Sequence, residues 1–494
     1  MTGRRVKDPH DVRAALVVSA VTVGVLLLVA LVSSPTSLLL VRAEPAPPVA
    51  APRAVVPSEA VDAAAGRPVP EPTEPEVRAP APEVPSPVDS VEAALEAALD
   101  ARDGAVARRT PGGWTAAGGS DADFRIVLSL PFTRFESEVV DDALEPVGDA
   151  DPAAAGEWTA RVRTTYSLDG TLAVQRQDTV TLRRGAEPAD AEGALAGADR
   201  WRVVTWEPWP AEDALGTPAP WQLGPVAVAR GERGLVLAWP EAPAGEAEVA
   251  AATTWAQELA GYVETGAVVV DSYLGTGWPR DSVLLAPATP EQFAALVPGE
   301  RPDGDGVFAA LTIDVTTVDG TGDVVVVNPG ARAELTDDTW QVTLTHELVH
   351  VASGALYGDT QELWLAEGFA DLVGWSTVVP GRVDRELVAA RLLSRVRSGD
   401  AAATVLPPRE AFSEGDADVV GDAYEGSWLA VLLLEDEIGT DALLDLYAQA
   451  SDESVAETAE ERTEAALLTA TGQGREAFEQ RWSAYVTALS ADAR

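Results

Sequence analysis

The first long run of hydrophobic positions lies near the N-terminus. Nineteen residues from Ala14 to Val32 carry no charge, which is enough for a helix to cross the hydrocarbon core of a bilayer. Four basic residues precede this run: Arg4, Arg5, Lys7 and Arg13. Because positive charge stays on the cytoplasmic side, we predict a cytoplasmic tail at 1–13, a single transmembrane anchor at 14–33 and an extracellular remainder. A signal peptide cleaved after Ala43 is the alternative, and it exports the same residues.

The hydrophobic pattern stops at the next segment, 34–87, which is rich in Pro, Ala and Glu. Proline fixes φ and removes a backbone donor, so frequent proline prevents both helices and sheet ladders. We therefore predict a disordered linker that holds the folded part of the chain away from the membrane.

A folded unit is predicted at 88–215. Asp89 and Ser90 are suited to cap a helix that begins with the sequence VEAALEAALDAR. Strand-like runs follow at four places: Phe124–Leu130, Trp158–Leu168, Leu172–Arg183 and Trp201–Trp206. One helix followed by antiparallel strands resembles the cone-shaped α+β fold of nuclear-transport-factor-like domains. The region holds no catalytic cluster, so the expected role is that of a spacer or binding domain.

The pattern changes again for the segment 235–494. Ala247–Val263 has helical periodicity, Val283–Ala286 and Val324–Val327 are strand-like, and long helices dominate the rest. The predicted fold class is α+β, with the N-terminal transmembrane helix, the disordered tether, the small cone-like domain and then a mainly helical domain with a small mixed sheet.

Composition narrows the possible chemistry. The formal net charge of −44 would repel a phosphate backbone, which excludes nucleic acid as a partner. Arginine supplies nearly all the positive charge, as is typical of a high-GC bacterial genome. There is no cysteine, so disulfides and thiolate metal sites are excluded. Any metal must be held by carboxylates, water and the three histidines, which are His10, His346 and His350.

Two of these histidines belong to one motif. The stretch Asp337–Ala352 reads as an amphipathic helix that ends near Gly354, with acidic residues in its first turn. His346 and His350, four residues apart, lie one turn above the other, so both imidazoles can reach one ion. Glu347 lies beside them and points far enough away to hold a water, as a general base does.

The following segment carries the next candidates. Its sequence, TrpLeuAlaGluGlyPheAla at 364–370, resembles the gluzincin zinc metallopeptidases of the peptidase MA-like family, in which a glutamate on the next helix completes the metal site. The resemblance implies Zn²⁺ held by His346, His350 and Glu367, with Asp371 orienting a ligating histidine. Glu362 or Asp371 as the third ligand stays open.

The same resemblance implies further parts of a peptidase. A tyrosine donates a hydrogen bond to the developing oxyanion, and Tyr424 matches its usual position, with Tyr357 as the nearer alternative in sequence. The strand at 324–329 matches an edge strand that binds extended substrate, or it is an ordinary sheet strand. The stretch 478–486 resembles the closing helix of the family, so the resemblance covers about 240–490.

We therefore expect a membrane-anchored extracellular zinc metallopeptidase that hydrolyses a peptide or protein substrate, with Glu347 accepting a proton from the attacking water. No motif for binding a free N-terminal amine is evident, which favours an endopeptidase. Two alternatives remain: a non-catalytic exported scaffold with a relic zinc site, and a zinc amidase acting on cell-wall peptide. Substrate identity and oligomeric state are not indicated by the sequence.

Overall fold

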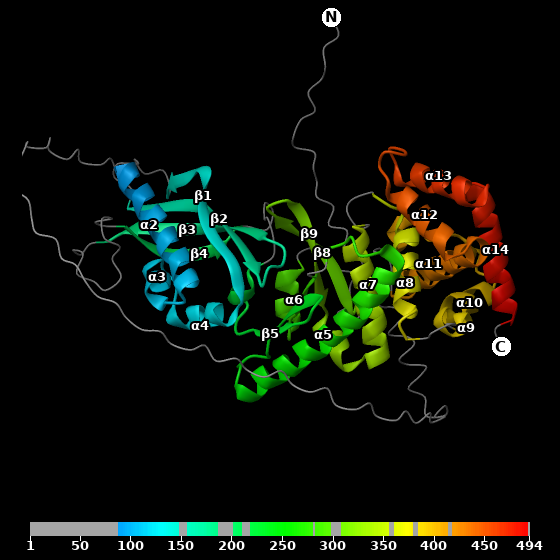
Figure 1. Ribbon diagram of the computed structural model, residues 1–494, viewed down its shortest axis with the longest axis horizontal. Coiled ribbons are helices and arrows are strands. Elements are labelled where there is room, and N and C mark those ends of the chain that lie inside the picture. Colours follow the sequence, from blue (N-terminus) through cyan, green and yellow to red (C-terminus); the bar gives the residue numbers. More distant parts are fainter. Residues whose placement is uncertain are drawn as a thin grey trace, which may run out of the picture.

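The computed structural model describes residues 87–147, 156–185, 201–209, 218–279, 282–297, 308–354, 360–378, 384–412 and 417–492 (Figure 1). The predicted anchor at 14–33 and almost all of the predicted linker at 34–87 lie outside these ranges. Within them, no helix is both long and apolar enough to span a bilayer. The fold class and localisation that included a single-pass anchor are therefore corrected: the structure supports a mixed helix-and-sheet fold and gives no support to a membrane-spanning helix.

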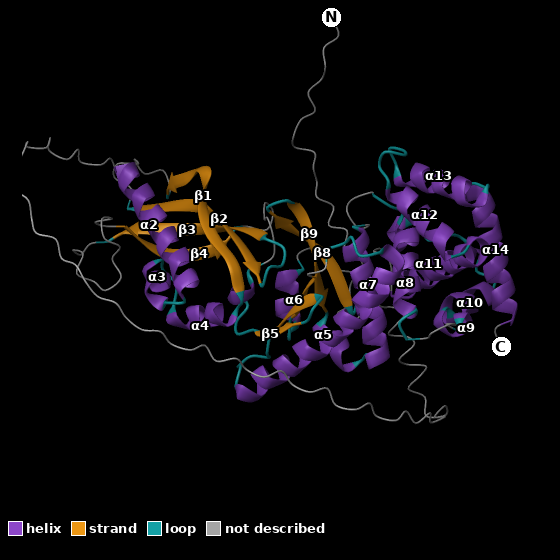
Figure 2. Ribbon diagram, in the orientation of Figure 1, coloured by secondary structure: helices purple, strands orange, loops and turns teal. Residues whose placement is uncertain are grey.

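The N-terminal unit combines three helices with four antiparallel strands. Its elements are α2 (Pro87–Arg108), α3 (Pro111–Ala116), α4 (Asp121–Ser129), β1 (Phe132–Pro146), β2 (Glu157–Leu168), β3 (Val174–Arg184) and β4 (Trp201–Pro208). Helix α2 packs against β1 and β4 (Figure 2) and buries Leu95 and Leu99 against Val162 and Leu182. The helix begins at Pro87, two residues before Asp89, the first residue of the predicted cap.

One predicted strand of this unit, Phe124–Leu130, is wrong, because most of it is helix α4. The side chain of Ser120 accepts a hydrogen bond from the backbone N–H of Asp123, and the carboxylate of Asp123 accepts one from the backbone N–H of Ser120. This capping box starts a helix. Phe124 and Val127, three residues apart, then face the core together.

The second unit begins with a mixed sheet and two helices. Its strands are β5 (Ala227–Arg230), β6 (Gly234–Ala238), β7 (Ser282–Ala286), β8 (Ala310–Thr317) and β9 (Gly320–Val327), and the short 3-10 helix η2 (Pro220–Gln222) precedes them. Strands β6, β7 and β9 run parallel, whereas β5 and β8 are antiparallel to their neighbours. Helices α5 (Glu246–Leu274) and α6 (Pro290–Leu296) connect them. Strand β9 lies between β8 and β7, so the predicted edge strand at 324–329 is an interior strand.

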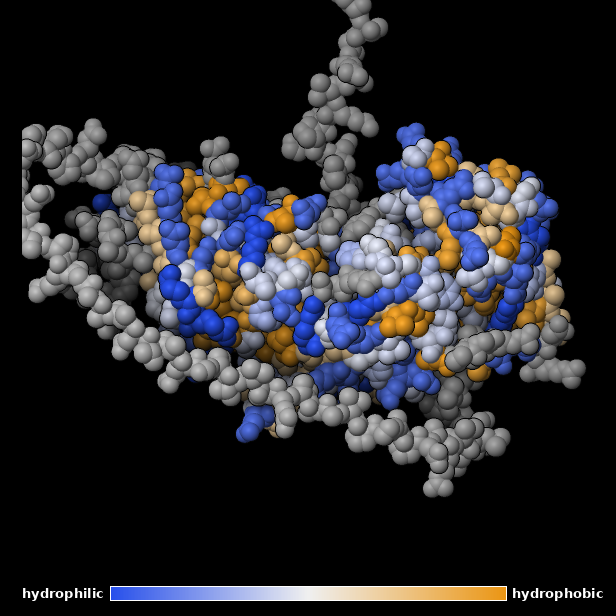
Figure 3. All heavy atoms as spheres, viewed as in Figure 1, coloured by the Kyte–Doolittle hydropathy of each residue, from blue (hydrophilic) through white to orange (hydrophobic). Residues whose placement is uncertain are grey.

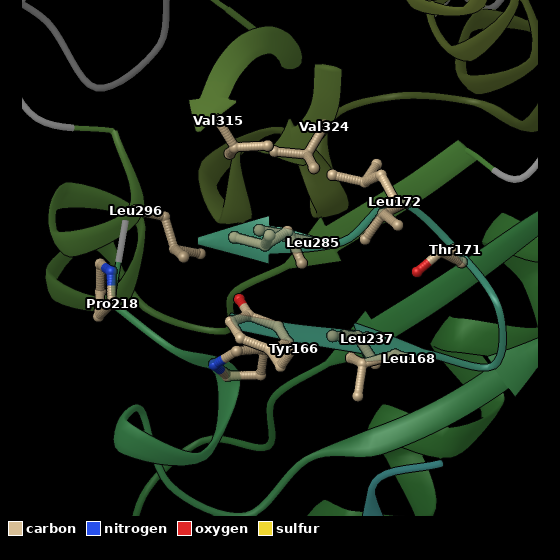
Figure 4. A pocket seen from close by; sticks show the side chains of 13 residues that line it. Tyr166, Leu168, Thr171, Leu172, Pro218, Leu237, Leu285, Leu296, Val315 and Val324 are labelled. Atoms are coloured by element: carbon tan, nitrogen blue, oxygen red, sulfur yellow. The ribbon is translucent and has the colours of Figure 1, made fainter. Parts of the chain in front are cut away.

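The two units share one sheet of nine strands, with the order β1-β2-β3-β8-β9-β7-β6-β5 and β4 paired to β3. The junction is short: β3 meets β8 only at Val174 and Thr317. The expectation of a separate small sheet is therefore corrected. A small, mainly apolar pocket lies at this junction, where Tyr166 and Thr171 are the lining residues with side-chain polar atoms (Figure 4).

Helices make up the rest of the second unit (Figure 1). They are η3 (Pro329–Ala333), α7 (Asp337–Ser353), α8 (Leu363–Trp375), α9 (Arg385–Val388), α10 (Ala390–Arg397), η4 (Ala401–Thr404), η5 (Arg409–Phe412), α11 (Ala417–Ile438), α12 (Thr440–Ser451), α13 (Ala459–Thr471) and α14 (Arg475–Asp492). Helix α7 packs on β8 and β9 and contacts α5 and α8. Helix α11 packs against α8. On the face in Figure 3, apolar residues lie in several separate areas among polar ones.

Candidate metal centre

Helix α7 carries the first part of the site. The side chain of Thr336 accepts from the backbone N–H of Thr339 and caps the helix, and Gly354 ends it in the left-handed conformation (φ 61°). Every residue from Thr339 to Val351 is buried. The predicted amphipathic helix is therefore enclosed on all sides, and its polar positions face the protein interior.

Helix α8 carries the second part, and its start is tied to the C-terminal helices. The carbonyl of Thr360 accepts from Arg462, the amide of Gln361 donates to the carbonyl of Tyr447 at 3.2 Å, and Glu362 pairs with Arg475. These three consecutive residues fix the point at which α8 begins. Glu362, which the sequence left open as a metal ligand, is committed to Arg475 instead.

Three side chains from the two helices converge in the interior. The Nε2 atoms of His346 and His350 are 2.9 Å apart, and Oε2 of Glu367 lies 3.1 Å from the first and 3.3 Å from the second. Each side chain can offer one ligand atom, and these atoms all lie within 4.8 Å of one another. All three residues are at most 1% exposed. Two imidazole nitrogens and one carboxylate oxygen form a donor set that suits zinc.

Asp371, one turn beyond Glu367 on α8, fixes the orientation of the first histidine. The Nδ1–H of His346 donates to Oδ1 of Asp371 at 2.8 Å, so Nε2 is the ring nitrogen that faces Glu367. Burial alone lowers the pKa of His346, but the carboxylates of Asp371 and Glu367 outweigh burial and raise that pKa to about 10. For Glu367 burial raises the pKa, and His350 and His346 outweigh it, so the pKa is held well below its usual range.

Glu347 lies beside this group and is held from the sheet. Oγ1 of Thr312, on β8, donates to its Oε2 at 2.5 Å. Within the described residues, Oε1 of Glu347 has no hydrogen-bond partner. Burial raises the pKa of this carboxyl, while His346, His350 and Thr312 lower it in part. The arrangement gives a fully buried carboxylate with one oxygen fixed and the other available.

The tyrosines are placed as follows. Tyr424, on α11, is buried, with its ring centroid 6.4 Å from that of His346 and 5.4 Å from that of Phe412. Tyr357 lies outside the described residues. Tyr447, on α12, stacks on Phe369 with centroids 4.1 Å apart, and its hydroxyl bonds Oγ of Ser353. Tyr424 is thus the predicted tyrosine that lies next to the histidine pair.

Thr312 is the contact that the sequence gave no reason to select, because the strand that carries it was not predicted. The alternation of apolar and polar positions in ALTIDVTT, residues 310–317, is the signal that would have found β8. Its partner could not have been found in this way, since the contact with Glu347 joins positions 35 residues apart.

Comparisons with known proteins add a coarse likeness. No protein-family model matches the chain, and no curated protein matches it. Two solved structures of a mutant M1 zinc metallopeptidase from Deinococcus radiodurans are similar, one of them bound to a Tyr-Ser-Ala substrate. The substrate complex is 12% identical with a TM-score of 0.29, covering 67% of this chain and 90% of that chain. The other has the same identity and TM-score, covering 71% and 95%. At this TM-score the likeness carries no weight for function.

Proposed function

We propose that this chain is a zinc-dependent hydrolase that cleaves peptide bonds. The observation that carries the proposal is the convergence of His346, His350 and Glu367 in the interior, beside a Glu347 carboxylate oxygen that has no partner among the described residues. When bound there, zinc would supply Lewis acidity and lower the pKa of a water molecule.

Each side chain then has one task. His346, His350 and Glu367 hold the ion, and Asp371 keeps the tautomer of His346 that leaves Nε2 free to bind it. Glu347 accepts the proton of the attacking water and passes it to the leaving amine. Tyr424 donates a hydrogen bond to the oxygen on which negative charge develops. A scaffold with a relic site has no need for the buried, unpaired oxygen of Glu347.

The pairing of strand β8 supports an extended peptide as substrate. Strand β8 pairs with β9 along its whole length on one side. On its other side, within the described residues, β8 is paired by a strand only at Thr317. A peptide in extended conformation can add to such an edge by backbone hydrogen bonds. Because Thr312 of the same strand contacts Glu347, a peptide bound there would lie close to the catalytic group.

The decisive experiment combines metal analysis with cleavage of a broad peptide library. The wild-type chain should bind about one zinc and cleave peptides, and a chelator should abolish cleavage. His346→Ala, His350→Ala and Glu367→Ala should each lose most of the zinc. Glu347→Gln should keep the zinc and lose 10²–10⁴-fold in rate, because only the proton acceptor is removed. Tyr424→Phe should lose about 10²–10³-fold.

The alternatives give different results. A wild-type chain that binds zinc and cleaves nothing in the library favours the scaffold. Cleavage restricted to cell-wall peptide favours the amidase. Full zinc content in Glu367→Ala removes the third ligand from the proposal and makes Asp371 the next candidate.

A further inference from the structure

We propose that Thr312 is a positioning residue that orients the Glu347 carboxylate, so that one of its oxygens is always presented as the proton acceptor. This inference rests on the proposed function, because it concerns the base of that reaction. Both described hydrogen bonds of the Thr312 side chain go to Glu347, so we expect it to act through Glu347.

The need for such a residue follows from the side chain of glutamate. The preferred values of χ3, the last side-chain torsion of glutamate, are broadly distributed and roughly two-fold. Helix α7 therefore fixes the backbone position of Glu347 but not the rotation of its carboxylate plane. A hydrogen bond at one oxygen removes this freedom. Oγ1 of Thr312 lies 2.5 Å from Oε2, the short distance typical of a hydroxyl donating to a charged oxygen.

The donor itself is rigid. Thr312 is 3% exposed and sits within β8, opposite Val325 of β9. Threonine is branched at Cβ, so few χ1 rotamers are open to it, and the pairing of β8 with β9 along its whole length restrains the backbone. The hydroxyl donates its single proton to Oε2, and Oε1, which has no partner among the described residues, is the oxygen left for the proton of the attacking water.

A purely structural role would use a different contact. The same hydroxyl lies 3.4 Å from the backbone carbonyl of Glu347, which would tie β8 to α7 whatever the side chain at position 347. The test must therefore separate the carboxylate contact from the carbonyl contact.

The first arm measures kinetics. Thr312→Val keeps the shape and removes the hydroxyl, and it should lower kcat by about ten- to hundredfold, the value of one hydrogen bond to a charged group. KM and zinc content should stay at wild-type levels, because both described hydrogen bonds of the hydroxyl go to Glu347 and neither goes to a proposed metal ligand. Thr312→Ser restores the donor and should recover most of kcat. Thr316→Val, on the same face of β8, is the matched control and should leave kcat unchanged.

The second arm needs neither metal nor activity. In metal-free protein, the denaturation midpoint is measured for Thr312→Val, Glu347→Ala and the double variant. The backbone carbonyl is present in all of them, so coupling between the two changes reports the carboxylate contact alone. We expect Thr312→Val to lower the midpoint in the wild-type background and to have little effect in Glu347→Ala.

The outcomes are distinct. Two results would overturn the positioning role. One is a midpoint shift in the double variant equal to the sum of the shifts in the two single variants, and the other is a Thr312→Val variant with wild-type kcat. A wild-type chain without any peptidase activity would instead count against the proposed function, and the midpoint arm would still decide whether Thr312 holds the carboxylate.

Discussion

Adding a single methyl group to Gly368 should loosen the metal centre without touching a ligand. Gly368 follows Glu367 on α8, where the helix packs against α11. A Cβ at this position would lie 2.3 Å from the carbonyl oxygen of Ser427 and 2.8 Å from Cγ2 of Val431. Since ordinary contacts begin at 3.4 Å and the nearest atom belongs to the backbone, the two helices must separate by roughly 1 Å.

The expected magnitudes follow from two opposing terms. Overpacking costs up to ~3 kcal/mol, and alanine is better than glycine inside a helix by ~1 kcal/mol. Gly368→Ala should therefore lower the free energy of unfolding of the metal-free protein by about 1–2 kcal/mol. A metal site tolerates ligand shifts of only ~0.2 Å, so movement of Glu367 should weaken zinc binding at least tenfold.

The assay pairs chemical denaturation of the metal-free protein with a competitive zinc titration. Gly261→Ala is the matched control, because Gly261 lies in helix α5 with no atom within 4 Å of the added Cβ. It should raise stability by up to about 1 kcal/mol and leave zinc affinity unchanged. If Gly368→Ala were as stable as wild type and bound zinc as tightly, the contact between α8 and α11 would not determine the position of Glu367.

Three further predictions concern ionisable groups. Asp371→Ala should weaken zinc binding by about 10–100-fold in the same titration, because His346 loses the partner that sets its tautomer; unchanged affinity would exclude this role. Because the pKa of His346 is raised to about 10 in the metal-free protein, zinc must displace a proton, so affinity should rise with pH up to that value; calorimetry in buffers of different ionisation enthalpy should detect the released proton, and none at neutral pH would contradict the assignment. Burial raises the pKa of Glu425 to about 7, so its contribution to stability is present below about pH 4.5 and is lost as pH rises through 7; Glu425→Gln should remove on the order of 3 kcal/mol of this pH dependence, and parallel stability curves for the two proteins would refute it.

The parts of the site that share one helix were accessible from the sequence. Helical spacing alone places His346 and His350 on one face, and Gly354 marks the end of α7. The context of Glu367 pointed to a residue that the structure brings next to His346 and His350, and Asp371 follows one turn later on the same helix. The sequence left Glu362 and Asp371 open as alternatives to Glu367, and their partners depend on tertiary structure: Glu362 pairs with Arg475, and Asp371 bonds Nδ1 of His346.

Errors arose where local pattern competes with long-range packing. The segment Phe124–Leu130 contains residues that favour strands, but the capping box at Ser120 and Asp123 makes it a helix. The run at 324–327 was correctly identified as a strand, yet its place inside the sheet depends on pairing with β8, which was not predicted. Contacts between positions far apart in the sequence determine which strands pair and which lie at the edge of the sheet. Hydrophobic periodicity predicts the type of an element but not its partners.

The burial of the ionisable residues at the candidate metal centre is itself an argument for a function. Four ionisable side chains, His346, Glu347, His350 and Glu367, are at most 1% exposed. Burying such groups costs free energy unless each is paired or holds a metal. Apolar side chains of the same volume at these buried positions would need no hydrogen-bonding or ionic partners and would cost less free energy. The proposed reaction needs a desolvated carboxylate beside a cation and would account for their presence, with the hydroxyl of Thr312 keeping that carboxylate in one orientation.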